Sequence, residues 1–289
     1  MAGSSMRDIK RRIRSVKSIE KITNAMKLVS AAKLRQTRNA FDKTHEALMF
    51  ITDNMDKLCS RAEEIPSRYI AGSREIKRAC YIVVTSNRGL AGSYNANVIK
   101  AVEKEMKNDP EKPVFVCIGA KGLKYFSKRD HEILSENQEP PEKISFEKTQ
   151  EMIREVIELY DKEIIDEVFV VYTMFVSTIE QHPVTVRLLP FVHEQGASDK
   201  KLKILPEYEP SPTEVFDYLV KKYVEIMTFR ILVEAATCEH AARRMAMQNA
   251  TDNAHEMTGS LELFYNRARQ AAITSEITEI VSGADAIKD

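Results

Sequence analysis

The chain has 289 residues with 43 basic and 43 acidic side chains, so its formal net charge is zero. This length is enough for one large or two smaller domains, each with a real hydrophobic core. Only 7% of the residues are aromatic, 30% are charged, and there are nine glycines and no tryptophan. This composition favours helices and argues against an all-β fold. The longest uncharged apolar stretch, 168–179, is far shorter than the roughly 18 residues that span a membrane.

Glycine and proline divide the chain into three zones, because both residues interrupt regular elements. All ten prolines fall between Pro66 and Pro212, whereas 4–65 contains neither glycine nor proline. The zone 213–289 contains no proline and only two glycines. We therefore predict a long helix in 1–65, a central domain in 75–208 and a second long helix in 212–286.

Apolar residues recur in both outer zones at the spacing of a coiled-coil seam. In the N-terminal zone this seam consists of Ile9, Ile13, Val16, Ile19, Ile22, Met26 and Val29. In the C-terminal zone it consists of Val224, Met227, Ile231, Ala235, Cys238, Ala242 and Met245, after which the same register becomes polar at Asn249, Asp252 and Glu256. Residues 1–43 hold twelve Lys and Arg against three Asp and Glu, whereas 213–289 hold eight against twelve. Because a long helix needs a packed apolar face, we predict that the two zones pair as a long antiparallel coiled coil.

The central zone alternates apolar runs with amphipathic segments. Its predicted strands are Cys80–Thr85, Pro113–Ile118, Val168–Val176 and Val184–Leu189. Its predicted helices are Asn95–Met106, Gly122–Ser127 and Ser145–Ile165. Continuous Val, Ile and Phe runs separated by helices are typical of parallel strands that are covered on both faces. We therefore expect the α/β fold class, with a Rossmann-like three-layer domain between the coiled-coil helices.

No pattern in the sequence predicts an active site or a cofactor site. The loop 86–95 follows a strand and opens a helix, but its glycines fit neither dinucleotide-binding nor P-loop spacing. We therefore interpret it as a tight, hydrogen-bonded turn that caps the helix. The six histidines are scattered, and the four cysteines (Cys59, Cys80, Cys117 and Cys238) form no metal-binding or C-x-x-C pattern. We expect no cofactor, no metal, and a reducing compartment.

Two surfaces of the predicted helices are candidates for binding a partner. Lys10, Arg14, Lys17 and Lys21 form a positive edge along the first helix, which suits nucleic acid, an acidic protein surface or plain solvent. From 261 onward, apolar residues cover most of the circumference of the second helix. The first helix is too short to cover this end, so we expect the end to insert into another protein.

Four segments resemble the γ subunit of the rotary F-type ATP synthase. They are MRDIKRRIRSVKSIEKITNAMKLVSAAKLR (6–35), TSNRGLAGSYN (85–95), RMAMQNATDNA (244–254) and YNRARQAAITSEITEIVSGADAI (265–287). The resemblance implies a non-catalytic central shaft that rotates inside a hexamer of α and β subunits. It further implies contacts with the ε subunit and with the membrane-embedded ring of c subunits, and no nucleic acid. The ring would be its one link to the membrane, at the cytoplasmic face of a bacterial plasma membrane.

The same resemblance implies which residues meet the hexamer. Arg269 and Gln270 would reach a β-subunit loop that catches the shaft, supported by Thr274, Glu276, Thr278 and Glu279. An acidic β-subunit hinge segment would face Met26, Lys27, Lys33, Arg35 and Arg244. The region 190–212 is short and free of cysteine, so thiol control of the chloroplast kind is not expected. The competing interpretation is a stand-alone coiled-coil adaptor or nucleic-acid binder with an α/β head.

Overall fold

The computed structural model describes residues 6–59, 67–70, 77–108, 111–192 and 209–285. It divides into two compact units, which we call the helical unit (6–30 with 244–285) and the α/β unit (31–243). Two long helices run through both units: α1 (Met6–Cys59) and α5 (Pro212–Asp285), with 54 and 74 residues. The two long helices predicted from the absence of glycine and proline are thus confirmed.

The α/β unit contains one five-stranded sheet with the order β3-β2-β1-β4-β5. Its strands are β1 (Ala79–Val84), β2 (Val114–Ile118), β3 (Glu132–Asn137), β4 (Glu167–Phe175) and β5 (Gln181–Leu189). The first four strands are mutually parallel, whereas β5 runs antiparallel to β4. All four predicted strands are confirmed, and the α/β class with them.

The sequence analysis was wrong about the sheet at one point. It missed β3, because the strand EILSEN has few apolar residues and lies at the edge of the sheet, where it is only partly buried. The strands that helices separate are parallel, as predicted. Only a short turn separates β4 from β5, and a parallel connection needs a crossover of a dozen or more residues, so these two strands form a hairpin.

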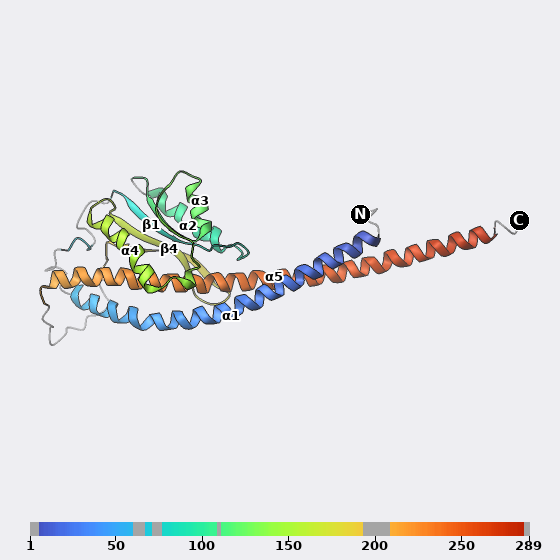
Figure 1. Cartoon of the computed structure of the whole chain (residues 1–289), viewed down its shortest axis with the longest axis horizontal. Coiled ribbons are helices and arrows are strands. Elements are labelled where there is room, and N and C mark those ends of the chain that lie inside the picture. Colours follow the sequence, from blue (N-terminus) through green and yellow to red (C-terminus); the bar gives the residue numbers. More distant parts are fainter. Residues whose placement is uncertain (1–5, 60–66, 71–76, 109–110, 193–208, 286–289) are drawn as a thin grey trace. The chain divides into compact units, whose positions relative to one another are not determined.

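Helices cover both faces of the sheet, as predicted (Figure 1). On one face, α2 (Tyr94–Glu105) and α3 (Ala120–Ser127) pack on alternate residues of β1 and β2. On the other face, the remaining strand residues pack on α4 (Phe146–Asp161) and on α5. The short 3₁₀ helices η2 (Met106–Asn108) and η3 (Pro141–Lys143) complete the unit.

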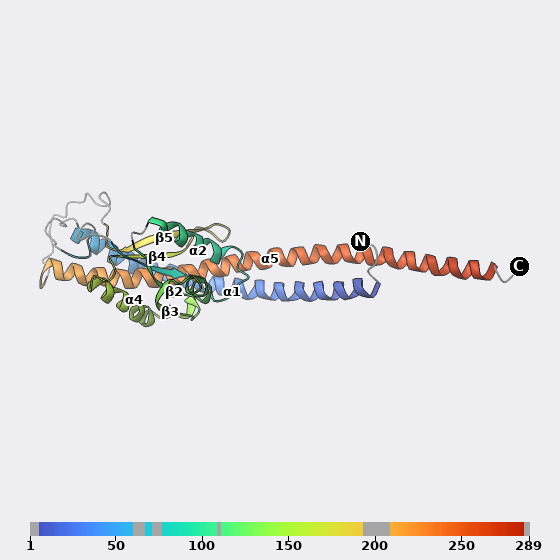
Figure 2. The same ribbon diagram turned by 90° about the horizontal axis from the view of Figure 1, so that it is seen from above.

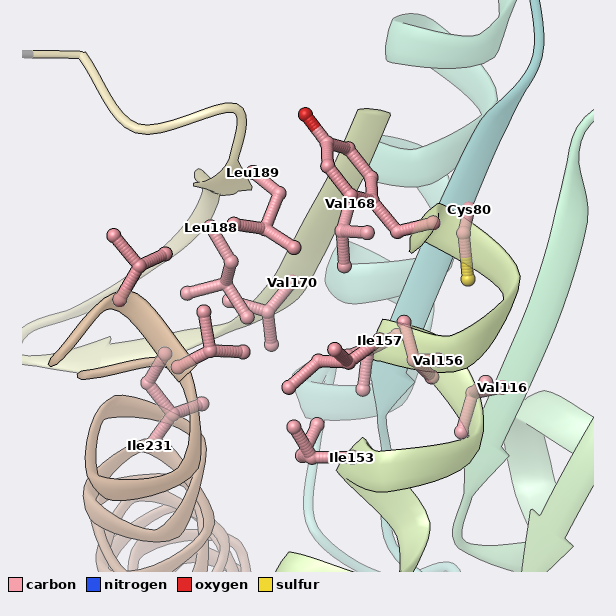
Figure 3. Packing of buried hydrophobic residues seen from close by; sticks show 14 of the residues in the cluster. Cys80, Val116, Ile153, Val156, Ile157, Val168, Val170, Leu188, Leu189 and Ile231 are labelled. Atoms are coloured by element: carbon pink, nitrogen blue, oxygen red, sulfur yellow. The ribbon is translucent and has the colours of Figure 1, made fainter. Parts of the chain in front are cut away.

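The main core lies between the sheet, α4 and α5 (Figure 3). Ile153 and Ile157 of α4 point toward Val170 and Leu188 of the sheet, and Ile231 of α5 closes the cluster. All eleven residues of α5 from 231 to 241 are buried. The core therefore surrounds α5 here, although the buried stretch includes Glu234, Thr237, Glu239 and His240.

A glycine controls the passage from β2 into α3. Gly119 has a φ of +94°, and a Cβ at this position would lie 2.1 Å from the carbonyl oxygen of Thr85. The Thr85 hydroxyl in turn accepts a hydrogen bond from the Gly122 amide at 2.9 Å. The carboxyl ends of β1 and β2 can approach this closely because residue 119 has no side chain.

In the helical unit, α1 and α5 lie side by side and antiparallel (Figure 2). Three cross-helix contacts set the register: Lys17 with Glu262 at 2.6 Å, Glu20 with His255 at 3.2 Å, and Thr23 with Thr251 at 2.8 Å. The inward-facing positions of α5 include the buried Met247, Ala254 and Thr258.

The predicted seam of α1 is correct at its start and wrong further along. Ile9 is buried, but Ile19, Ile22 and Val29 are 49%, 57% and 59% exposed. The buried positions are instead Thr23 and Ser30, which continue from Ile9 at strict seven-residue spacing. The two helices pack with heptad spacing, and polar residues are tolerated in the seam because the Thr251 hydroxyl donates a hydrogen bond to that of Thr23. An apolar stripe of α1 is thereby left on the surface.

Candidate partner-binding surface

The C-terminal end of α5 continues beyond the end of α1 in the helical unit (Figure 1). The antiparallel register places the N-terminal end of α1 beside residues near 270 of α5. The following apolar side chains are exposed: Ile273 by 46%, Ile277 by 57%, Ile280 by 70% and Val281 by 54%. Exposed apolar residues at this density mark a binding surface. We call this end, residues 271–282, the apolar tip.

The residues predicted to support the tip contact lie on its exposed surface. Arg269, Gln270, Thr274 and Glu276 are all exposed, and so are Thr278 and Glu279. The Thr274 hydroxyl donates to the Gln270 carbonyl at 2.9 Å, and the Thr278 hydroxyl to the Thr274 carbonyl at 2.9 Å. The threonines are therefore satisfied by their own helix, whereas the exposed Arg269 and Gln270 directly precede the apolar tip.

The apolar stripe of α1 is the part of this surface that the sequence analysis did not recognise. Ile19, Ile22, Leu28 and Val29 are exposed, and Met26 lies half-buried among them. Their helical spacing was the signal, but that spacing is equally expected of a seam. The exposed Lys10, Arg14 and Lys21 run beside the stripe, while Lys17 is paired with Glu262.

The other predicted partner-binding residues are divided between the two units. Lys27 is half-buried and Arg244 is exposed in the helical unit, whereas Arg35 is exposed in the α/β unit. Lys33, also in the α/β unit, donates to the carboxylate of Glu142 at 2.9 Å. The structure therefore does not bring all the predicted residues together into one site.

The loop between β1 and α2 is the tight, hydrogen-bonded turn that was predicted. The Asn95 side chain accepts from the Ser86 amide at 2.9 Å, and the Asn87 side chain accepts from the Ala120 amide at 2.9 Å. The predicted helix cap is absent, because the Ser93 side chain at the N-cap of α2 makes no capping hydrogen bond. Leu90 projects from the turn with a φ of +64° and is 63% exposed.

The same loop is fastened to α5. Arg243 pairs with Glu239 at 2.7 Å and also reaches the carbonyls of residues 88 and 89. Tyr94 is buried, which raises the pKa of its hydroxyl well above the usual value, and this hydroxyl donates to the Ala235 carbonyl at 3.2 Å. These contacts give the loop a structural role in holding α5.

Within the described ranges, no group of three or more His, Cys, Asp and Glu side chains is placed to hold a metal ion. No helix in the part of the chain that the structure describes is long and apolar enough to cross a membrane. Cys80, Cys117 and Cys238 are buried free thiols.

Comparison with known proteins identifies the family. The sequence model of the family described as ATP synthase matches residues 5–287. The ATP synthase gamma chain of Alkaliphilus metalliredigens is 45% identical over 99% of this chain and 100% of its own length. That of Heliobacterium modesticaldum is 42% identical over 98% and 99%, and the sodium-ion-specific gamma chain of Acetobacterium woodii is 37% identical over 98% and 99%.

The fold agrees with solved rotor structures. A chain of the Euglena gracilis mitochondrial ATP synthase, solved with its OSCP, F1 and c-ring, aligns with a TM-score of 0.67 at 19% identity, covering 98% of this chain and 94% of that chain. A central-stalk and c-ring structure from Tetrahymena thermophila aligns with a TM-score of 0.59 at 19% identity, over 79% of this chain and 99% of that chain. With relatives of 37–45% identity along its whole length, the chain belongs to the ATP synthase gamma chain family.

Proposed function

We propose that this chain is the central shaft of an ATP synthase and turns inside a hexamer of α and β subunits. The observation that carries the proposal is the apolar tip, an unpaired helix end with exposed isoleucines. Exposing these apolar side chains to water is unfavourable in free energy, and a surrounding ring of subunits would remove that cost by covering them. The near full-length relatives named as gamma chains support this function and disfavour a stand-alone adaptor.

The finer partner assignments follow from the same proposal. Arg269 and Gln270 bind a loop of one β subunit, and the basic edge with Met26, Lys27, Arg35 and Arg244 faces acidic β-subunit surface. The α/β unit contacts the ε subunit and the ring of c subunits, which places the chain at the cytoplasmic face of a bacterial membrane. The ATP chemistry takes place on the β subunits, and this chain contributes movement to it without a catalytic residue.

Co-expression with the α and β subunits of the same organism tests the proposal. Lys128 is exposed at the end of α3, so a Lys128→Cys, Cys59→Ser variant can carry a bead while the buried Cys80, Cys117 and Cys238 stay unreacted. With the hexamer fixed to a surface, we expect ATP to drive rotation of the bead in one direction, and ADP to drive none. A chain that does not co-purify with α and β, or a complex that hydrolyses ATP without turning the bead, would refute the proposal.

A further inference from the structure

Glu142 joins three elements of the α/β unit. It lies in η3, between β3 and α4, and its carboxylate accepts from Lys33 of α1 at 2.9 Å. The same oxygen lies 3.4 Å from Nε2 of His240 on α5. The Glu142 side chain is 16% exposed and that of His240 only 4%. One carboxylate of η3 therefore contacts both long helices, on the shielded α5 side at His240 and on the α1 side at Lys33, whose side chain is 45% exposed.

The backbone that carries Glu142 is held firmly. Pro140 and Pro141 precede it, and proline fixes φ near −65°. On the N-terminal side, the Asn87 side chain donates to the Gln138 carbonyl at 2.7 Å. On the C-terminal side, the Ser145 hydroxyl caps α4 by accepting from the Lys148 amide. A force on the sheet is thus transmitted to the Glu142 carboxylate, because the loop that connects them deforms little.

The charge on this carboxylate is stabilised. Burial by itself would raise the pKa of Glu142, but its contacts with His240 and Lys33 outweigh burial and lower it to about 2. The carboxylate therefore stays ionised at any working pH. Charge-assisted contacts are stronger and more directional than neutral ones, whereas apolar contacts such as those between the sheet and α5 are not directional.

We propose that Glu142 is the positioning residue through which torque passes between the α/β layers and both shaft helices. This inference rests on the proposed shaft function and adds a named point of transmission to it. Apolar packing keeps the layers together but resists sliding weakly, whereas the paired carboxylate resists displacement of either helix along the sheet. Lys33 then serves inside the chain, as the α1 side of this connection.

The test uses the complete ATP synthase reconstituted in lipid vesicles, with Glu142→Gln, Glu142→Asp and His240→Gln variants. Glu151→Gln, an exposed glutamate of α4, is the matched control. We expect unloaded ATP hydrolysis to be the same in all of them, and the number of ions pumped per ATP against a gradient to fall in Glu142→Gln. Glu142→Asp should recover part of this loss. His240→Gln should lower the ratio less than Glu142→Gln does, because Lys33 still pairs with the carboxylate.

A second measurement separates torque transmission from misfolding. Amide hydrogen exchange of residues 142–145 should accelerate roughly tenfold in Glu142→Gln, which corresponds to about 1.4 kcal/mol. Exchange in the sheet core should stay unchanged. If Glu142→Gln pumps as many ions per ATP as Glu151→Gln, the inference is wrong while the shaft function stands. If the unmodified chain fails to assemble with α and β, the shaft function itself is wrong.

Discussion

Replacing Ile277 and Ile280 of the apolar tip by glutamine should weaken assembly with the hexamer. The two side chains are 57% and 70% exposed in the chain alone. Full burial of an isoleucine side chain contributes about 1.5–3 kcal/mol, so covering these exposed fractions contributes roughly 2.5 kcal/mol for the pair. Its loss corresponds to a fall of about 70-fold in affinity. Glutamine is at least as good a helix former as isoleucine, so the helix itself should persist.

The measurement is a titration of the α and β hexamer with fluorescently labelled chain, at constant salt, together with circular dichroism of the free chain. Ile179→Gln is the control, because Ile179 is 80% exposed in the turn between β4 and β5, far along the chain from the tip. We expect unchanged helicity for both variants and weaker binding for the tip variant alone. Affinities within twofold of the unmodified chain would show that no partner covers these isoleucines.

Three further perturbations have expected outcomes. Arg269→Ala should lower assembly or ATP turnover of the complex, and Arg269→Lys should not restore it, because lysine cannot reproduce the planar fork of donors. Gly119→Ala should lower the free energy of unfolding by roughly 3 kcal/mol or more, because the new Cβ clashes with the Thr85 carbonyl and the φ is positive. Gly259→Ala, whose Cβ would meet no atom within 4 Å, should raise the free energy of unfolding by about 1 kcal/mol. Thermal melting of the two variants measures both effects. The pKa of Glu142 is about 2 in the folded chain and 4.5 without partners, so the stability that this carboxylate contributes should be fully present above pH 4.5 and lost as the pH falls toward 2. Urea midpoints across this range should show the loss, and Glu142→Gln should show a smaller one.

The sequence predicted those elements whose formation depends on local rules. The absence of glycine and proline from 4–65, and of proline from 213–289, predicted α1 and α5, because no residue there interrupts a helix. The Val- and Ile-rich runs predicted β1, β2, β4 and β5, and for β1 and β2 the reason is that strands buried on both faces need apolar residues at every position. The apolar tip was also visible in the sequence, because its apolar residues cover more of the helix than one partner can reach.

The sequence could not decide between two faces of α1. Local spacing placed Ile19, Ile22 and Val29 in the seam, yet the structure buries Thr23 and Ser30 on another face instead. The choice depends on what α5 presents on the other side, where the Thr251 hydroxyl meets that of Thr23. A seam is a property of two helices, and one helix alone does not determine it.

The connection at Glu142 shows the same limit at longer range. Lys33 and Glu142 are 109 positions apart in the chain, and neither residue belongs to a pattern that marks it. The fold places η3 beside both α1 and α5, which brings Lys33 and His240 to the same carboxylate. Sequence periodicity therefore determined which segments become helices and strands, because these depend on neighbouring residues. Tertiary structure alone decided which apolar face stays exposed and which charges meet, because these depend on residues that only folding brings together.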